Sequence, residues 1–105
     1  MVGAAADLWL LIAKSSMNKN SFRVVPSKIK RFVPFLGASL PCAEVTSDHW
    51  WKWVRWLKRE VAAGRMAHTT AKVNINRARE FVRWLVANGK AHVEGMNKSA
   101  EAALA

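Results

Sequence analysis

The sequence predicts an all-α protein, a compact bundle of four main helices, and two observations support this prediction. Apolar residues recur at spacings of three and four in four separate stretches of the 105-residue chain. The segments between them are short and contain Gly, Pro or Asn, and no stretch shows the strict alternation of a strand. A chain of this length holds one domain with a single core.

The first helix is expected over residues 3–16. This stretch is rich in good helix formers and places Leu8, Leu11 and Ile12 on one side of the helix. A polar connector follows at residues 17–21, in which Ser21 is a candidate cap for the next segment.

The second helical segment is expected over residues 22–36, with Gly37 as its C-terminal stop. Its apolar positions are Phe22, Val25, Ile29, Phe32, Val33 and Leu36. Pro26 suits a regular helix that begins there or one residue earlier, because the first turn needs no N–H from proline. Pro34 is expected to kink or tighten the last turn. Away from the apolar stripe lie Arg23, Ser27, Lys30 and Arg31, with Lys28 on the far flank.

The third helix is expected after a loop at residues 38–45, with Thr46 or Ser47 as its cap and Gly64 at its end. Asp48 lies in the first turn, where the helix dipole favours a negative charge. One face of this helix carries Trp50, Val54, Leu57 and Val61, with Trp53 at its margin.

The fourth helix, residues 69–89, carries two different faces. An apolar stripe that must be buried consists of Ala71, Ile75, Ala78, Val82 and Leu85, with Phe81 and Val86 at its edges. About a quarter-turn away lies a second stripe, here called the basic ridge, which consists of Lys72, Asn76, Arg79 and Arg83. The ridge has three positive charges, one amide and no carboxylate. Such a stripe is ordinarily a helix face exposed to solvent. Its Arg, Lys and Asn side chains are also those that contact phosphates and base edges in a groove of DNA.

The charge of the whole chain favours a polyanionic partner. Lys and Arg number 17 against 7 Asp and Glu, which gives a net charge of +10. Between Asp7 and Glu44 there is no carboxylate, although six basic residues lie there. The single cysteine, Cys42, fits a reducing compartment, so we expect a cytoplasmic protein. The apolar run 8–13 is far too short to span a membrane.

Catalytic and metal chemistry have little support in the sequence. The histidines at positions 49, 68 and 92 are far apart, and none lies at a metal-ligand spacing from Cys42. The carboxylates are scattered singly, and no glycine-rich phosphate loop is present. We therefore expect no catalytic residue, no metal and no cofactor in this chain.

A set of motifs resembles the N-terminal core-binding (SAM-like) domain of the tyrosine recombinase and phage integrase family. The segment FVPFLG at residues 32–37 looks like the end of that family's second helix. The other matching positions are Val45 and Thr46 at the next helix start, Thr70, Ile75, Arg79, Phe81, Trp84 and Leu85 on the long helix, and Asn88, Gly89 and Lys90 after it. The resemblance covers roughly residues 5–97. It implies a DNA-binding domain over residues 1–97 and a tail, or the start of a linker to a separate catalytic domain, over residues 98–105.

The resemblance also implies which residues contact DNA, because the family places its second and fourth helices against the major groove. The implied contacts are Arg23, Ser27, Lys30, Arg31, Thr69, Thr70, Lys72, Asn76, Arg79 and Arg83. Arg79 has a second interpretation, in which it bridges helices instead of contacting DNA. The family cleaves DNA with a tyrosine on its catalytic domain, and this chain contains no tyrosine. Its implied partners are double-stranded DNA, a catalytic domain and neighbouring recombinase subunits, with no membrane.

Two alternatives belong to other functional classes. Trp51, Trp56 and Trp84 lie off the apolar stripes, where exposed aromatic rings would mark a protein-interaction module. Partial burial under Lys and Arg stems would explain the same rings. Peripheral membrane binding through the helix at 48–63 is the weakest alternative, because that helix needs its apolar face for the core.

Overall fold

The computed structural model describes residues 1–91 and residue 93, and this part of the chain is all-helical with no strand. Its elements are α1 (Val2–Ser16), the short α2 (Lys19–Phe22), α3 (Val25–Leu36), the 3-10 turn η1 (Cys42–Glu44), α4 (Ser47–Ala62) and α5 (His68–Ala87). The predicted all-α class with four main helices is therefore confirmed here. The tail expected at 98–105, and the end of the domain at 97, lie outside the described residues.

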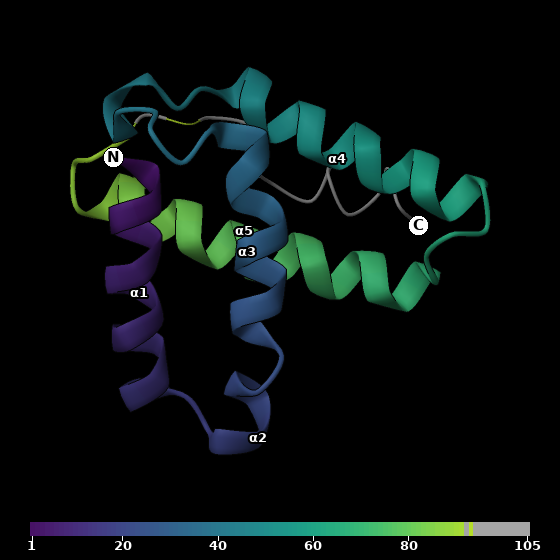
Figure 1. The fold of residues 1–105 in the computed structure, drawn as a ribbon, viewed down its shortest axis with the longest axis horizontal. Coiled ribbons are helices and arrows are strands. Elements are labelled where there is room, and N and C mark those ends of the chain that lie inside the picture. The colour runs from purple at the N-terminus through teal and green to yellow at the C-terminus, as the bar shows by residue number, and fades with distance from the viewer. Residues whose placement is uncertain (92, 94–105) are drawn as a thin grey trace.

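The helices form two antiparallel pairs that cross each other (Figure 1). In Figure 1, α1 and α3 lie side by side and are joined at one end through α2, whereas α5 runs across both of them and α4 extends alongside α5 from the end of α3. The helix α3 contacts each of the other helices, and α5 contacts α1, α3 and α4. The outer surface of α5 is therefore the part of this helix available to a partner.

The core forms where the apolar stripe of α5 meets the aromatic faces of the other helices. All five predicted stripe residues of α5, Ala71, Ile75, Ala78, Val82 and Leu85, are buried, and so is Phe81. The Phe32 ring meets Trp50 and Trp53 edge to face, with centroids 6.1 and 5.1 Å apart. On the α1 side, Trp9 packs against Phe81 at 5.7 Å.

The segment expected as one helix over residues 22–36 is divided into α2 and α3, and proline explains the division. In a continuous helix, Pro26 would face the carbonyl of Phe22 without an N–H to donate, and its ring would clash there. The chain breaks after Phe22 and begins α3 at Val25, which places Pro26 in the first turn as predicted. The prediction for Ser21 was wrong, because Asn18 caps α2 by accepting the Asn20 N–H at 2.8 Å. Gly37 ends α3 with a φ of +93°, as expected.

Thr46 is the cap of α4, one of the two predicted candidates. Its backbone N–H donates to Nδ1 of His49 at 3.0 Å, and its hydroxyl lies 3.1 Å from the same nitrogen. The Thr46 side chain in turn accepts from the His49 backbone N–H, so His49 takes the place that Glu or Gln usually has in a capping box.

The side of α1 that the sequence singles out is not the side that packs. Leu8, Leu11 and Ile12 are exposed, while Val2, Ala5, Ala6, Trp9 and Ala13 form the buried side. Small side chains allow α1 to lie close to its neighbours, and Trp9 supplies most of the apolar volume. In the described part of the chain, every helix is too short or too polar to cross a bilayer.

Candidate nucleic-acid interface

The basic ridge of α5 lies mostly in solvent. Lys72, Asn76 and Arg83 are exposed. The ion pairs among the described residues join Arg65 to Glu60 and Arg77 to Glu80. Within this part of the chain, therefore, no carboxylate neutralises Lys72 or Arg83, and both charges are available to an anion.

Arg79 differs from the rest of the ridge because only 8% of its surface is exposed. Its Nη1 donates to Oδ1 of Asn76 at 3.3 Å, which holds that amide on the ridge. Burial of this degree favours the interpretation in which Arg79 supports the fold, and it leaves direct DNA contacts to its neighbours.

The middle of the ridge borders a shallow polar hollow of about 280 Å³ on the outer side of α5. The residues that line it are Val73, Asn76, Arg77, Arg79, Glu80 and Arg83. Glu80 is already paired with Arg77, whose Nη1 donates to the two carboxylate oxygens at 2.9 and 3.2 Å. Arg83 is the exposed guanidinium of this hollow that has no ion pair among the described residues, so this end of the hollow suits a phosphate more than a cation.

The first turn of α5 and the first turn of α3 form a second hollow. Lys28 of α3 and Val24, the residue just before α3, line it together with Thr69, Thr70 and Val73 from α5, and its volume is about 270 Å³. Both predicted threonines thus lie beside α3. Lys28 was not among the predicted contacts, although it lies in this hollow. Val24 and Lys28 are four residues apart, so they lie on the same side at the start of α3. The sequence does not show that this side faces α5, because that depends on how the two helices cross.

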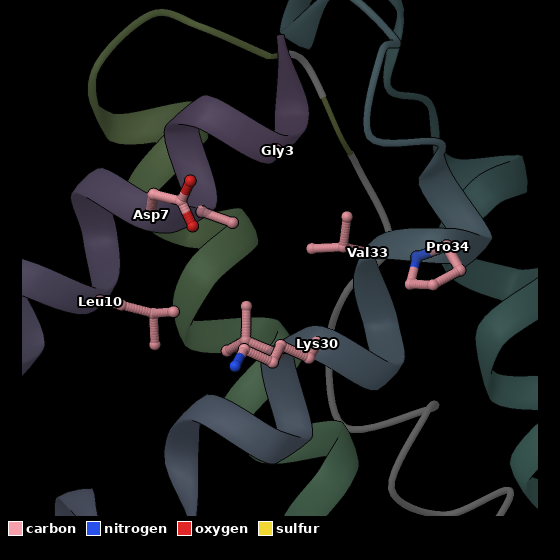
Figure 2. A pocket seen from close by; sticks show the side chains of 8 residues that line it. Gly3, Asp7, Leu10, Lys30, Val33 and Pro34 are labelled. Atoms are coloured by element: carbon pink, nitrogen blue, oxygen red, sulfur yellow. The ribbon is translucent and has the colours of Figure 1, made fainter.

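The predicted contacts on α3 do not all lie on one side of the molecule. Lys30 lines a groove of about 230 Å³ between α1 and α3, where Figure 2 shows it across from Asp7 and near Leu10. Arg31 is exposed and, as the next residue of the helix, projects about 100° away from Lys30. Lys30 therefore belongs to a different surface from the basic ridge.

The two remaining predicted contacts, Arg23 and Ser27, are exposed near the start of α3. Ser27 donates its hydroxyl to the Val24 carbonyl at 3.0 Å, so its proton is already engaged, while its oxygen can still accept. Arg23 lies between α2 and α3 and keeps its charge in solvent.

The tryptophans expected to mark a protein contact are half-buried. Trp56 stacks on Trp53 with centroids 5.6 Å apart and meets Phe35 at 5.1 Å, and Trp84 stacks on Phe81 at 6.4 Å. Trp51 also packs partly against the core. These rings mainly extend the core, so their positions give the protein-interaction module little support.

In the described part of the chain, no cluster of three or more His, Cys, Asp and Glu residues is arranged to hold a metal ion. Cys42 is a free, half-buried thiol. No protein-family model matches the chain, and no curated protein or solved structure is significantly similar to it. The resemblance to the tyrosine recombinase family therefore stays a prediction from sequence motifs.

Proposed function

We propose that this chain binds double-stranded DNA through the outer surface of α5 and the adjoining start of α3. The observation that supports this most is the exposure of Lys72 and Arg83 on one helix, with no carboxylate partner among the described residues. Phosphate contacts position a protein on DNA, and Arg, Lys and the short polar side chains provide most of them.

The dimensions of α5 fit this role. Lys72 and Arg83 are separated by eleven residues, or about 16 Å of helix, which equals roughly five base-pair steps of about 3.4 Å along the axis of a DNA duplex. An α-helix is narrow enough to enter the major groove. The other helices pack against the opposite side of α5, so they support it and leave Lys72, Asn76 and Arg83 exposed.

The hollow between α3 and α5 extends the positive surface toward the N-terminus of α5. Lys28 supplies a charge there, and the hydroxyl groups of Thr69 and Thr70 can donate to phosphate oxygens. The N–H groups in the first turn of α5 add the partial positive charge of the helix N-terminus. Together with Arg83 at the other end, these groups contact the backbone and provide little discrimination between base sequences.

We propose further that the chain serves as the DNA-binding domain of a tyrosine recombinase or integrase, with catalysis on a separate domain. This assignment depends on the motifs at 32–37, 45–46 and 70–90. The lack of any tyrosine in the chain requires the nucleophile to come from elsewhere. A catalytic domain and neighbouring recombinase subunits are the protein partners that follow from this proposal.

The salt dependence of binding tests the DNA proposal. We expect the logarithm of the association constant for a fluorescent 20-base-pair duplex to fall with the logarithm of salt at a slope of about −5, if about six phosphates are neutralised. Fluorescence anisotropy from 50 to 300 mM salt would measure it. A slope near −1, or no binding at 50 mM salt, would contradict a phosphate-based interface. Two duplexes of unrelated sequence should give affinities within a few-fold of each other.

A further inference from the structure

The exposed side of α1 has the pattern of a helix that pairs with another helix. Positions on this side recur at spacings of three, four, three and four, and they are Met1, Ala4, Leu8, Leu11 and Ser15. Leu8 is 47% exposed, Leu11 68% and Ile12, beside them, 42%. Ser15 donates its hydroxyl to the Ile12 carbonyl at 2.9 Å, which satisfies its donor locally. We call this side the α1 stripe.

The monomer does not need the α1 stripe for its own core, because α1 packs through the opposite side. A solvated helix of a monomer would carry polar residues at Leu8, Leu11 and Ile12. In the described structure, these are the exposed large aliphatic residues that lie together on one helix. Among the residues that the structure describes, the α1 stripe is therefore an unpartnered apolar surface.

The charges beside the α1 stripe indicate a second copy of this chain as its partner. Asp7 and Lys14 are the charged side chains of α1, and they lie seven residues apart on the same flank of the stripe. When two identical helices pair antiparallel about a two-fold axis, the same flanks meet. A pairing that places Leu8 against Leu11 of the second copy brings Asp7 within reach of Lys14 of the second copy, twice by symmetry.

The opposite flank of the α1 stripe offers a complementary hollow. Met1, Ala4, Ala5, Leu8, Cys42 and Lys90 line a volume of about 200 Å³ there. In the same antiparallel pairing, Ile12 of the second copy lies at the level of Ala5 and Leu8 on this flank. A cavity of roughly 150 Å³ already accepts a ligand the size of benzene, so a branched side chain can enter this hollow.

We propose that α1 pairs antiparallel with α1 of a second copy, with Leu8 packed on Leu11 and Asp7 facing Lys14 across the two-fold axis. One helix from each copy buries less than the roughly 800 Å² per partner of a standard interface, so the dimer is weak. Two chains of charge +10 repel each other. Added salt therefore strengthens this dimer, whereas it weakens DNA binding.

Sedimentation equilibrium from 10 to 500 µM, at 0.15 and 0.5 M salt, tests the pairing. We expect a monomer–dimer equilibrium that strengthens at the higher salt. The change Leu8→Ser with Leu11→Ser should weaken dimerisation at least tenfold, and circular dichroism should show an intact fold because both residues are exposed. The matched control is Val86→Ser, which alters an exposed apolar residue of α5 and should leave the dimer unchanged.

A charge exchange tests the antiparallel register. Lys14→Asp lowers the net charge and so reduces general repulsion, yet we expect it to weaken the dimer, because it places two carboxylates opposite each other. The double change Asp7→Lys with Lys14→Asp should restore the affinity. A dimer that tightens with Lys14→Asp alone would contradict the proposed register.

Three results would overturn the proposal. They are a monomer at 500 µM in both salts, a dimer that survives the Leu8 and Leu11 changes, and a monomer that binds anionic phosphatidylserine vesicles through the α1 stripe. DNA affinity measured at low micromolar protein should be the same for the wild type and the Leu8 and Leu11 variant. The dimer proposal can therefore fail while DNA binding holds, and DNA binding can fail while the dimer holds.

Discussion

Replacing Trp53 with Ala is expected to lower the free energy of unfolding by about 3 to 5 kcal/mol. Trp53 is fully buried at the junction of α3 and α4. Its ring meets Phe32 at 5.1 Å, Phe35 at 5.0 Å and Trp56 at 5.6 Å, so the truncation removes three aromatic contacts and leaves a cavity. Urea unfolding followed by circular dichroism at 222 nm would measure the change.

Two further variants show whether the loss comes from packing at this position. Trp51→Ala removes the same side chain from a half-buried site and should destabilise the protein by less than half as much. Trp53→Phe keeps an aromatic ring and removes an indole N–H that has no hydrogen-bond acceptor among the described residues. We expect Trp53→Phe to be the mildest of the three changes. Equal losses for Trp51→Ala and Trp53→Ala would contradict the description of this core.

Reversing two charges on the basic ridge should lower DNA affinity roughly 100-fold at 0.1 M salt. The change is Lys72→Glu with Arg83→Glu, and each substitution removes a charge-assisted phosphate contact of about 1.4 kcal/mol, a factor of ten. Both side chains are exposed and have no ion pair among the described residues, so the fold should be unaffected. Fluorescence anisotropy with a labelled duplex would measure the affinity, and thermal unfolding would verify stability.

The matched control reverses two exposed charges of α4, Lys58→Glu with Arg59→Glu. Each double change takes the formal net charge from +10 to +6, so both variants lose the same general attraction to DNA. We expect only a few-fold loss for the α4 pair, because these residues lie outside the proposed interface. Similar losses for the two pairs would mean that overall charge, and not the ridge, determines binding.

The features that could be predicted from the sequence are those set by local periodicity and local backbone rules. The apolar stripe of α5 is buried because residues at spacings of three and four must share a face, whatever packs against it. Thr46 caps α4 and Gly37 ends α3 through contacts with residues only a few positions away. The C-terminal end of α5 follows from the same rules, with Gly89 just after the helix at a φ of +67°.

The features that escaped prediction depend on contacts between distant parts of the chain. Hydrophobicity favours the leucines of α1 as its buried side, yet the start of α1 is fixed by the Val2 and Gly3 N–H groups, which donate to the Leu40 and Ala38 carbonyls at 2.8 and 2.9 Å. A Cβ on Gly3 would lie 3.2 Å from the Ala38 carbonyl oxygen, so only glycine fits comfortably there. This anchor directs the alanine side of α1 toward the core.

In the candidate site, too, some features follow from local sequence and others depend on contacts between helices. The exposure of Lys72, Asn76 and Arg83 follows from their angle to the apolar stripe of α5, and the sequence predicts it. The burial of Arg79 and the position of Lys28 beside Thr69 depend on how the helices cross, which no local pattern records.

The measurement that tests the central proposal most directly is a titration of the ¹⁵N-labelled protein with a short duplex, followed by NMR. The proposal predicts that the largest chemical-shift changes fall on the outer residues of α5, including Thr69, Lys72, Asn76 and Arg83, and on Lys28 of α3. The backbone amides of Leu8 and Leu11 on α1 should move little. Shift changes that cluster on α1 or on the outer face of α4, with Lys72 and Arg83 unmoved, would contradict it.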